Sequence, residues 1–434
     1  MHVSEEAPSN GNGYPKLVSK NTAGIIPTFA ANYFYDVTTE GDYNWFTKDR
    51  ITAEDALTGY GVILNENPFA DAPGGDFTLT NALAISERIG DQRWNPNKTV
   101  RPDDWFAVAD VESLLTAIDA GKQNIELAYG VYDFTDETVV HDAVSNGKIT
   151  FTNALSLRGK MKDGKKPKLV GSFVLSGDAG NSFGVTGIEI EGIGDYLITM
   201  ASNAVANKVS LRNNDIKKVG GLVYGAKNNA SVIKTLEITG CYFDEIGEKD
   251  FIDFRDGTTL NSVNVMRNTF ANGIRTFARI DASCVCSVVK VQNNTFYNLC
   301  FADNKDNNGI FHARATTLAQ SNYIVRNNIF ASMHKLEGAP TDANNNGFPK
   351  LLSTNAQSIV PDFGNNLYYD VDTAESATSW FTPGKRTDMT EADVVAAATA
   401  DGGQVLTDTP FAGDPTTGKF TLIVDYKGIG DPRW

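Results

Sequence analysis

The chain has 434 residues, of which 41% are hydrophobic and 21% are charged, a composition typical of a folded globular protein. Its formal net charge of -15 argues against a nucleic-acid-binding protein, because neutralising phosphates requires a net basic face. No apolar run reaches the roughly 18 residues that a membrane-spanning helix needs, so we expect no transmembrane segment.

The first hundred residues resemble the last hundred. YPKLVSKNTAGIIPTFAANYFYDV at 14–37 aligns without gaps with FPKLLSTNAQSIVPDFGNNLYYDV at 348–371, and the likeness extends to IGDQRW at 89–94 and IGDPRW at 429–434. Residues 1–94 are therefore interpreted as a partial repeat that corresponds to the last coil and cap of a preceding unit. Two explanations stay open: a longer tandem protein with neighbouring repeats, or a cap duplicated within one gene.

A helix is predicted after a linker at 95–107. The stretch VADVESLLTAIDAGKQNIELAYGVYDF at 108–134 begins with helical spacing of apolar residues and continues as a strand pattern. The spaced residues are Val111, Leu114, Leu115 and Ile118. We expect an amphipathic helix that closes one end of a β structure, since an uncovered end would expose unpaired strand edges.

A shorter motif recurs along the middle of the chain, and VQNNTFYNL at 291–299 is typical of it. An alternating apolar run leads to a polar pair, and an aromatic residue or isoleucine follows two positions after the second member of that pair. The second members are separated by 27, 27, 26, 34 and 38 residues. They are Asn214, Cys241, Asn268, Asn294, Asn328 and Asn366.

This period indicates coils of a parallel β-helix, because leucine-rich repeats need regularly spaced leucines and propeller blades need roughly 40 residues each. Asparagine tolerates left-handed backbone angles at a sharp corner, and stacked asparagines hydrogen-bond as an amide ladder. The residues two positions later should point inward and stack. They are Ile216, Phe243, Phe270, Phe296, Phe330 and Tyr368.

The predicted fold is all-β: a single-stranded right-handed parallel β-helix over residues 108–371, with the N-terminal capping helix described above. A C-terminal cap is predicted for residues 372–434. TEADVVAAATA at 390–400 begins with a threonine and has an aspartate three positions later, which indicates a short helix within that cap.

These motifs are similar to those of the pectate-lyase-like superfamily of right-handed parallel β-helices, over about residues 105–371. GIGDPRW at 428–434 and FIDFRDG at 251–257 resemble segments of uncharacterised β-helix domains in surface lipoproteins that gut bacteria use on plant polysaccharides. The resemblance implies an extracellular or cell-surface bacterial protein whose partner is a pectin-like polysaccharide. The sequence contains neither a recognisable secretory signal nor a lipobox cysteine.

The candidate functional residues lie on the strand that follows each asparagine corner. Strand alternation sends one set of side chains to the core: Ile252, Phe254, Ala278, Ile280, Phe311 and Ala313. The opposite parity forms two outward columns of polar side chains. The first column contains Tyr224, Asp253, Arg279, His312 and Lys350, and the second contains Arg255, Asp281 and Arg314.

One interpretation of these columns is a lyase site. Removing the proton beside a uronate carboxyl group requires a base and cations that neutralise the developing charge. Arg279 or His312 would be the base, while Arg255 and Arg314 would hold the carboxylate. Tyr224, Lys350 and the two aspartates would contact substrate. Alternatively, Asp253 and Asp281 would bind calcium as a bridge to an acidic sugar.

Other interpretations compete with catalysis. Opposite charges on neighbouring strands also form salt-bridge ladders that keep an exposed sheet soluble and in register. A retaining glycosidase is less favoured, because neither aspartate lies in a glycosidase motif. Since the familiar pectate-lyase signatures are not recognisable, we expect a non-catalytic surface glycan-binding or scaffold module, with a lyase acting by β-elimination as the alternative.

Overall fold

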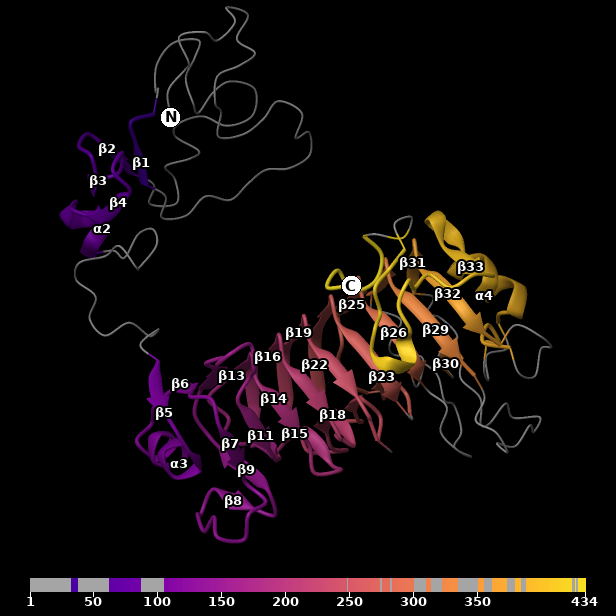
Figure 1. Ribbon diagram of the computed structural model, residues 1–434, viewed down its shortest axis with the longest axis horizontal. Coiled ribbons are helices and arrows are strands. Elements are labelled where there is room, and N and C mark those ends of the chain that lie inside the picture. Colours follow the sequence, from indigo (N-terminus) through magenta and orange to yellow (C-terminus); the bar gives the residue numbers. More distant parts are fainter. Residues whose placement is uncertain are drawn as a thin grey trace, which may run out of the picture. The chain divides into compact units, whose positions relative to one another are not determined.

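The computed structural model describes fourteen stretches of the chain, in two compact units that comprise residues 1–104 and 105–434. The larger unit is a parallel β-helix, as predicted: successive strands pass from one sheet to the next and stack coil upon coil (Figure 1). No helix in the described stretches is long and apolar enough to cross a membrane. These stretches are 33–37, 62–86, 105–247, 249–273, 275–281, 283–299, 310–313, 322–334, 350–354, 361–372, 379–383, 388–423, 426 and 428–434.

Three sheets form the walls of the β-helix. Sheet 1 contains β5 (Phe106–Val108), β6 (Asn124–Leu127), β10 (Leu155–Gly159), β13 (Asn181–Thr186), β16 (Val205–Arg212), β19 (Val232–Thr239), β22 (Thr259–Met266), β25 (Val288–Gln292), β28 (Asn322–Arg326) and β31 (Asp362–Gly364). Sheet 2 contains β7 (Val131–Asp133), β11 (Lys168–Val170), β14 (Glu189–Glu191), β17 (Asp215–Lys217), β20 (Tyr242–Asp244), β23 (Thr269–Gly273), β26 (Thr295–Leu299), β29 (Ile329–Met333), β32 (Leu367–Val371) and β33 (Gln404–Leu406). Sheet 3 contains β8 (Val144–Ser145), β9 (Lys148–Phe151), β12 (Ser172–Leu175), β15 (Tyr196–Met200), β18 (Gly221–Gly225), β21 (Ile252–Phe254), β24 (Ala278–Ile280), β27 (Phe311–Ala313) and β30 (Leu352–Thr354).

The predicted N-terminal capping helix is present as α3 (Val111–Asp119). Asp110 is its N-cap and accepts a hydrogen bond from the backbone N–H of Ser113, which satisfies one of the free donors of the first turn. Leu114 and Leu115 are buried in the same apolar core as the first coils. The helix therefore closes the end of the β-helix beside β5 and β6.

The C-terminal cap contains the predicted short helix, α4 (Glu391–Ala398). Thr390 and Asp393 form a capping box, and Val394 is fully buried against the core. Two single turns of 3₁₀ helix follow, η3 (Ala400–Gly402) and η4 (Pro415–Thr417).

The predicted inward column is confirmed, and its aromatic rings stack face to face. Ring centroids are separated by 4.8 Å between Phe243 and Phe270, and by 5.0 Å between Phe270 and Phe296. The stack continues at 5.0 Å to Phe330 and at 5.5 Å to Tyr368. Because each ring lies one coil above the last, the strand spacing of a parallel sheet sets the stacking distance.

The two positions of the asparagine corner have different roles. The first position adopts left-handed backbone angles, with φ of 52° at Asn213, 55° at Asn293 and 56° at Asn327. Glycine, which adopts such angles without strain, takes this position one coil after Asn213. The sequence pattern alone did not separate the residue that turns the chain from the residue that builds the ladder.

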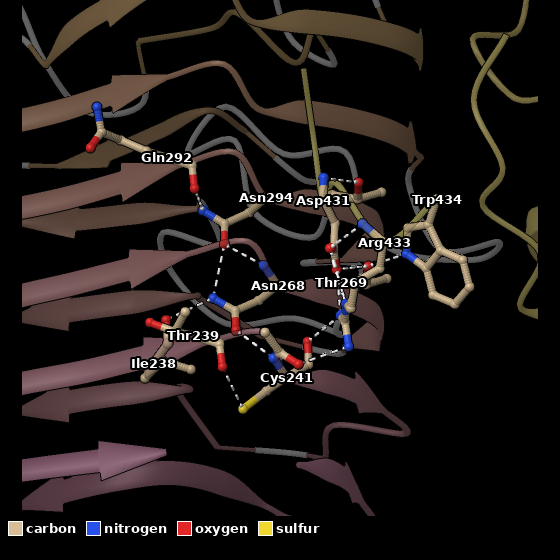
Figure 2. A network of polar contacts seen from close by, with 12 residues as sticks. Ile238, Thr239, Cys241, Asn268, Thr269, Gln292, Asn294, Asp431, Arg433 and Trp434 are labelled. Carbon is tan, nitrogen blue, oxygen red and sulfur yellow. Dashed lines mark hydrogen bonds and ion pairs between the residues drawn. The ribbon is translucent and has the colours of Figure 1, made fainter. Parts of the chain in front are cut away.

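The second position forms the predicted amide ladder, fully buried (Figure 2). The side-chain amide of Asn268 donates to the carbonyl oxygen of Asn294 at 2.9 Å, and Asn294 donates to Asn328 at 3.0 Å. Asn328 in turn donates to Asn366 at 3.0 Å. Cys241 replaces asparagine one coil below Asn268, and its backbone N–H donates to the side-chain oxygen of Asn268 at 2.9 Å.

The last part of the chain folds back over the outer face of sheet 2. A second apolar cluster joins outward side chains of β23, β29 and β32 to aromatic and aliphatic residues of the C-terminal segment. Its buried members are Ala271, Ile329, Ala331, Leu367, Phe411, Phe420 and Leu422. The cap therefore covers a side wall of the β-helix in addition to its end.

The smaller unit repeats the local structure of the C-terminal cap. β1 (Tyr33–Tyr35) pairs in parallel with β2 (Val62–Leu64) in the register in which β32 pairs with β33. β3 (Phe69–Asp71) pairs antiparallel with β4 (Asp76–Leu79), and the equivalent Phe411 and Leu422 form an antiparallel bridge. A short helix, α2 (Ala82–Ser86), follows β4. The sequence repeat therefore corresponds to a repeat of structure.

Candidate functional site

The predicted outward column forms on sheet 3. Tyr224 lies beside Asp253, Asp253 beside Arg279, and Arg279 beside His312 on successive coils. On the opposite face Ile252, Phe254, Ala278, Ile280 and Phe311 are buried in the core, as expected. Ala313 lies in β27, but its side chain is outside the described part of the chain, as is all of Arg314.

Lys350 was wrongly placed in this column. Ser353, three residues further along the chain, is the residue paired with His312, because β30 begins only at Leu352. Lys350 precedes the strand and is buried, and its carbonyl oxygen accepts a hydrogen bond from the backbone of Ile310.

The columns point away from the core, as predicted, but their two carboxylates and the imidazole are buried. The exposed fraction is 0% for Asp253, 4% for Asp281 and 5% for His312. The carboxylates are covered because neighbouring arginine and tyrosine side chains lie across them. A buried carboxylate needs such partners, since an unpaired charge inside a protein is strongly unfavourable.

Asp253 is the centre of this polar cluster. The Tyr196 hydroxyl donates to one carboxylate oxygen at 2.5 Å, and Arg255 contacts both oxygens, at 2.5 Å and 2.7 Å. Burial raises the pKa of Asp253, while the hydrogen bonds from Arg255 and Tyr196 act in the opposite direction. Burial and the adjacent Asp253 raise the pKa of Tyr196, so the phenol keeps its proton and remains the donor.

Asp250 gathers three arginines around a second buried carboxylate. Its oxygens lie 3.4 Å from Arg279, 3.6 Å from Arg275 and 3.7 Å from Arg255. Arg279 also contacts Asp281 at 3.1 Å. The ion pairs join residues two apart on one strand as well as residues of adjacent coils, so the cluster holds its guanidinium groups in fixed positions.

Next to this cluster the surface forms an open hollow of about 420 Å³. The rings of Tyr196 and Tyr224 stack beside it, with centroids 4.5 Å apart and planes inclined by 6°. The ammonium group of Lys249 lies 5.0 Å from the centre of the Tyr196 ring. The hollow is lined by Lys148, Asp195, Tyr196, Thr199, Tyr224, Lys249, Asp250, Arg255 and Arg275.

Sequence reasoning missed seven of these lining residues. Asp250 lies two residues before β21 and Arg275 three residues before β24, so extending the columns beyond the strands would have found both. The other five are Lys148, Asp195, Tyr196, Thr199 and Lys249. Four of them come from coils that precede the first polar-pair motif, where the motif gives no reference point.

Asp195 holds the two lysines at the rim of the hollow. It accepts a hydrogen bond from Lys148 at 2.5 Å and another from Lys249. Burial alone would raise the pKa of Asp195, but these bonds outweigh it and lower the pKa to about 2.

We predict that Asp195→Asn removes an acid-sensitive contribution to stability. Because the folded-state pKa is depressed, this contribution is present above pH 3.8 and is lost as pH falls towards 2. In urea unfolding, the difference between wild type and variant should therefore be large at pH 5 and small at pH 2.5. Glu137→Gln, at an exposed site, is the control. A difference that does not change with pH would contradict this assignment.

The hollow offers groups that can bind an anion, and neither candidate base lines it. Tyr224 is half-buried and offers an aromatic face, while Lys249, Arg255 and Arg275 supply positive charge around it. Arg279, one candidate base, is paired with Asp250 and Asp281, and its side chain is only 15% exposed. His312, the other candidate, is buried.

Calcium binding by Asp253 and Asp281 stays a prediction. In the structure their carboxylates are bonded to Arg255 and Arg279, which a cation would have to displace. Within the described stretches, His, Cys, Asp and Glu form no cluster of three or more suited to a metal ion.

Residues 130–273 match the model of a family described as a domain of unknown function, DUF4957. The matched region runs from the turn before β7 to the end of β23, so it includes Tyr196, Tyr224, Asp253 and Arg255 but ends before Arg275. No curated protein is significantly similar to the chain.

Proposed function

We propose that the chain is a non-catalytic module that binds an acidic, pectin-like polysaccharide in the hollow beside sheet 3. The observation that carries this proposal is the stacked pair Tyr196–Tyr224 at the edge of a hollow lined by lysine and arginine. The C–H face of a sugar ring packs on an aromatic ring, and guanidinium groups pair with carboxylates in bidentate fashion.

The internal ion pairs preorganise this surface. Tyr196 cannot rotate freely because its hydroxyl is bonded to Asp253 at 2.5 Å, and its ring supports that of Tyr224. Arg255 and Arg275 are held by Asp250 and remain 25% and 20% exposed at their side chains. A ligand therefore meets groups that are already ordered, which reduces the entropic cost of binding.

A position on the bacterial cell surface belongs to the same proposal. It is supported by the likeness of GIGDPRW and FIDFRDG to segments of surface lipoproteins that act on plant polysaccharides. A second cap-like unit in the chain is compatible with a tandem array, in which several weak sites bind one polymer with high avidity.

We predict that Tyr224→Ala weakens binding to polygalacturonate about tenfold, which corresponds to about 1.4 kcal/mol. Isothermal titration calorimetry of the full chain measures the loss. Tyr129→Ala is the matched control, because Tyr129 is 46% exposed and does not line this hollow. Wild-type affinity should fall with added salt if cations of the hollow meet the polymer's carboxylates.

The same polymers distinguish binding from cleavage. Incubation with polygalacturonate and other uronic-acid polymers, with and without calcium, should give no unsaturated product by ultraviolet absorbance. Product that disappears in Arg279→Ala or His312→Ala would establish a lyase and overturn the non-catalytic assignment. Unchanged affinity in Tyr224→Ala would show that the hollow is not the binding site.

A further inference from the structure

The C-terminal segment IGDPRW (429–434) is held against a corner of the β-helix by side-chain contacts that Figure 2 shows. The guanidinium of Arg433 donates to the backbone carbonyls of Gly240 and Cys241, each at 2.8 Å. The same group is paired with Asp431, which is fully buried. The segment thus reaches carbonyl groups about 190 residues earlier in the chain.

Two threonines on adjacent coils complete the contact. Thr269 donates its hydroxyl to Asp431 at 2.8 Å and accepts from the Trp434 indole at 2.7 Å. The backbone N–H of Asp431 donates to the Thr295 hydroxyl at 3.1 Å. Both threonines are buried, so these groups recognise the segment away from bulk water.

Gly430 is required by geometry. Its φ is +76°, and a Cβ atom there would lie 2.7 Å from Ile329 and 2.9 Å from the Thr295 hydroxyl. Its N–H donates to the carbonyl of Asn327 at 2.8 Å, and the Asn293 side chain donates to the carbonyl of Gly428 at 2.9 Å. The contact therefore selects the pattern Gly-Asp-x-Arg-Trp.

The docking position is fixed along the β-helix. On the described neighbouring coils of sheet 2, the residues that align with Thr269 and Thr295 are not threonine. The two adjacent threonine hydroxyls therefore occur at a single position along this part of the β-helix. Over this part of the column the aligned residues are Asp215, Tyr242, Thr269, Thr295, Ile329 and Leu367.

The N-terminal copy carries every side chain of the segment that this contact uses. IGDQRW at 89–94 supplies Gly90, Asp91, Arg93 and Trp94, and it differs from the C-terminal segment only where Gln92 replaces Pro432. The side chain of Pro432 makes none of the hydrogen bonds described above.

We infer that this corner is a binding site for Gly-Asp-x-Arg-Trp segments in general, and that segment 89–94 of a second copy of this chain is a ligand for it. The corner consists of Gly240, Cys241, Thr269, Thr295 and Asn327. Occupation by another molecule would link copies of the chain end to side. This inference does not depend on the proposed sugar binding.

The test uses the full chain with both of its own ligand segments disabled, by Asp91→Ala, Arg93→Ala, Asp431→Ala and Arg433→Ala. Fluorescently labelled peptides ERIGDQRW and YKGIGDPRW are titrated against it, and anisotropy is measured. We expect both to bind, with dissociation constants within about tenfold of each other. A peptide with alanine in place of the arginine that precedes the final tryptophan should bind at least tenfold more weakly. That arginine supplies the contacts to two backbone carbonyls, which the alanine peptide lacks.

A receptor variant separates recognition from nonspecific adhesion. Thr269→Val in the same background keeps the side-chain shape but removes the hydroxyl that meets both Asp431 and Trp434, so both peptides should lose affinity at least tenfold. If the fourfold variant does not fold by circular dichroism, the milder pair Arg93→Ala and Arg433→Ala is used. Binding of the YKGIGDPRW peptide alone, binding insensitive to Thr269→Val, or no binding to a folded chain would each overturn the inference.

Discussion

The substitution Asn294→Ala is expected to lower the free energy of unfolding by about 3–5 kcal/mol. Asn294 is fully buried and accepts hydrogen bonds from the backbone and the side-chain amide of Asn268, at 3.0 Å and 2.9 Å. It donates to the carbonyl of Val265 at 2.9 Å. Alanine leaves these groups without a partner in the interior, at about 1–3 kcal/mol each. Urea unfolding followed by circular dichroism measures the loss.

The neighbouring asparagine is the control for this prediction. Asn293 has a φ of 55° and makes one side-chain hydrogen bond to the carbonyl of Gly428, so Asn293→Gly keeps the backbone conformation and should cost no more than about 1 kcal/mol. Equal losses for the two substitutions would show that the ladder contributes no more than the corner geometry does.

Phe296→Ala should destabilise the chain by about 3–5 kcal/mol, the cost typical of removing a buried aromatic side chain. The ring of Phe296 is fully buried and stacks on Phe270 and Phe330, at 5.0 Å from each. It also contacts Phe277 edge to face at 5.1 Å. The surrounding coils cannot collapse to fill the cavity, because backbone hydrogen bonds to the coils on either side fix their spacing.

Phe296→Leu tests whether stacking adds to simple burial. Leucine restores most of the apolar volume, so the loss of volume alone should lower the free energy of unfolding by less than about 1.5 kcal/mol. Any further loss would come from the missing ring contacts. In a double-mutant cycle with Phe270→Leu, we expect a coupling of about 0.5–1.5 kcal/mol, the magnitude measured for aromatic pairs. A coupling of zero would mean that the ladder stabilises the chain through buried area alone.

The periodic features of the fold were predictable from the sequence. The positions of Asn294 and Phe296 recur once in each coil of the motif, with Cys241 and Ile216 as the exceptions, and a repeated residue must occupy a repeated environment when coils stack. The same reasoning placed Tyr224, Asp253, Arg279 and His312 on one column, because the register of a parallel sheet follows from the spacing of its corners. The first corner position turns the chain and the second builds the amide ladder. Telling these roles apart required backbone angles, which residue identity does not give.

The environment of the site was not predictable in the same way. Alternation along a strand distinguishes inward from outward, but it does not show what covers the outward face. Asp253 is buried because Tyr196, 57 residues earlier, and Arg255 lie across it. Lys350 was misplaced because residue counting assumes that every strand begins at the same distance from its corner, which the long insertion before β30 breaks.

The contact between Arg433 and the carbonyls of Gly240 and Cys241 also has a consequence for mechanical load on the C-terminus. Stacked coils peel from an end one at a time, since each terminal coil has a neighbour on only one side. If the C-terminal segment contacted only β33 and β32, a force on the C-terminus would act on these two strands first. Instead, Arg433 transmits the tension to the carbonyls of Gly240 and Cys241, several coils inward. A load on the C-terminus is therefore expected to break the contacts of Arg433 and of the buried Asp431 before it peels the last coils.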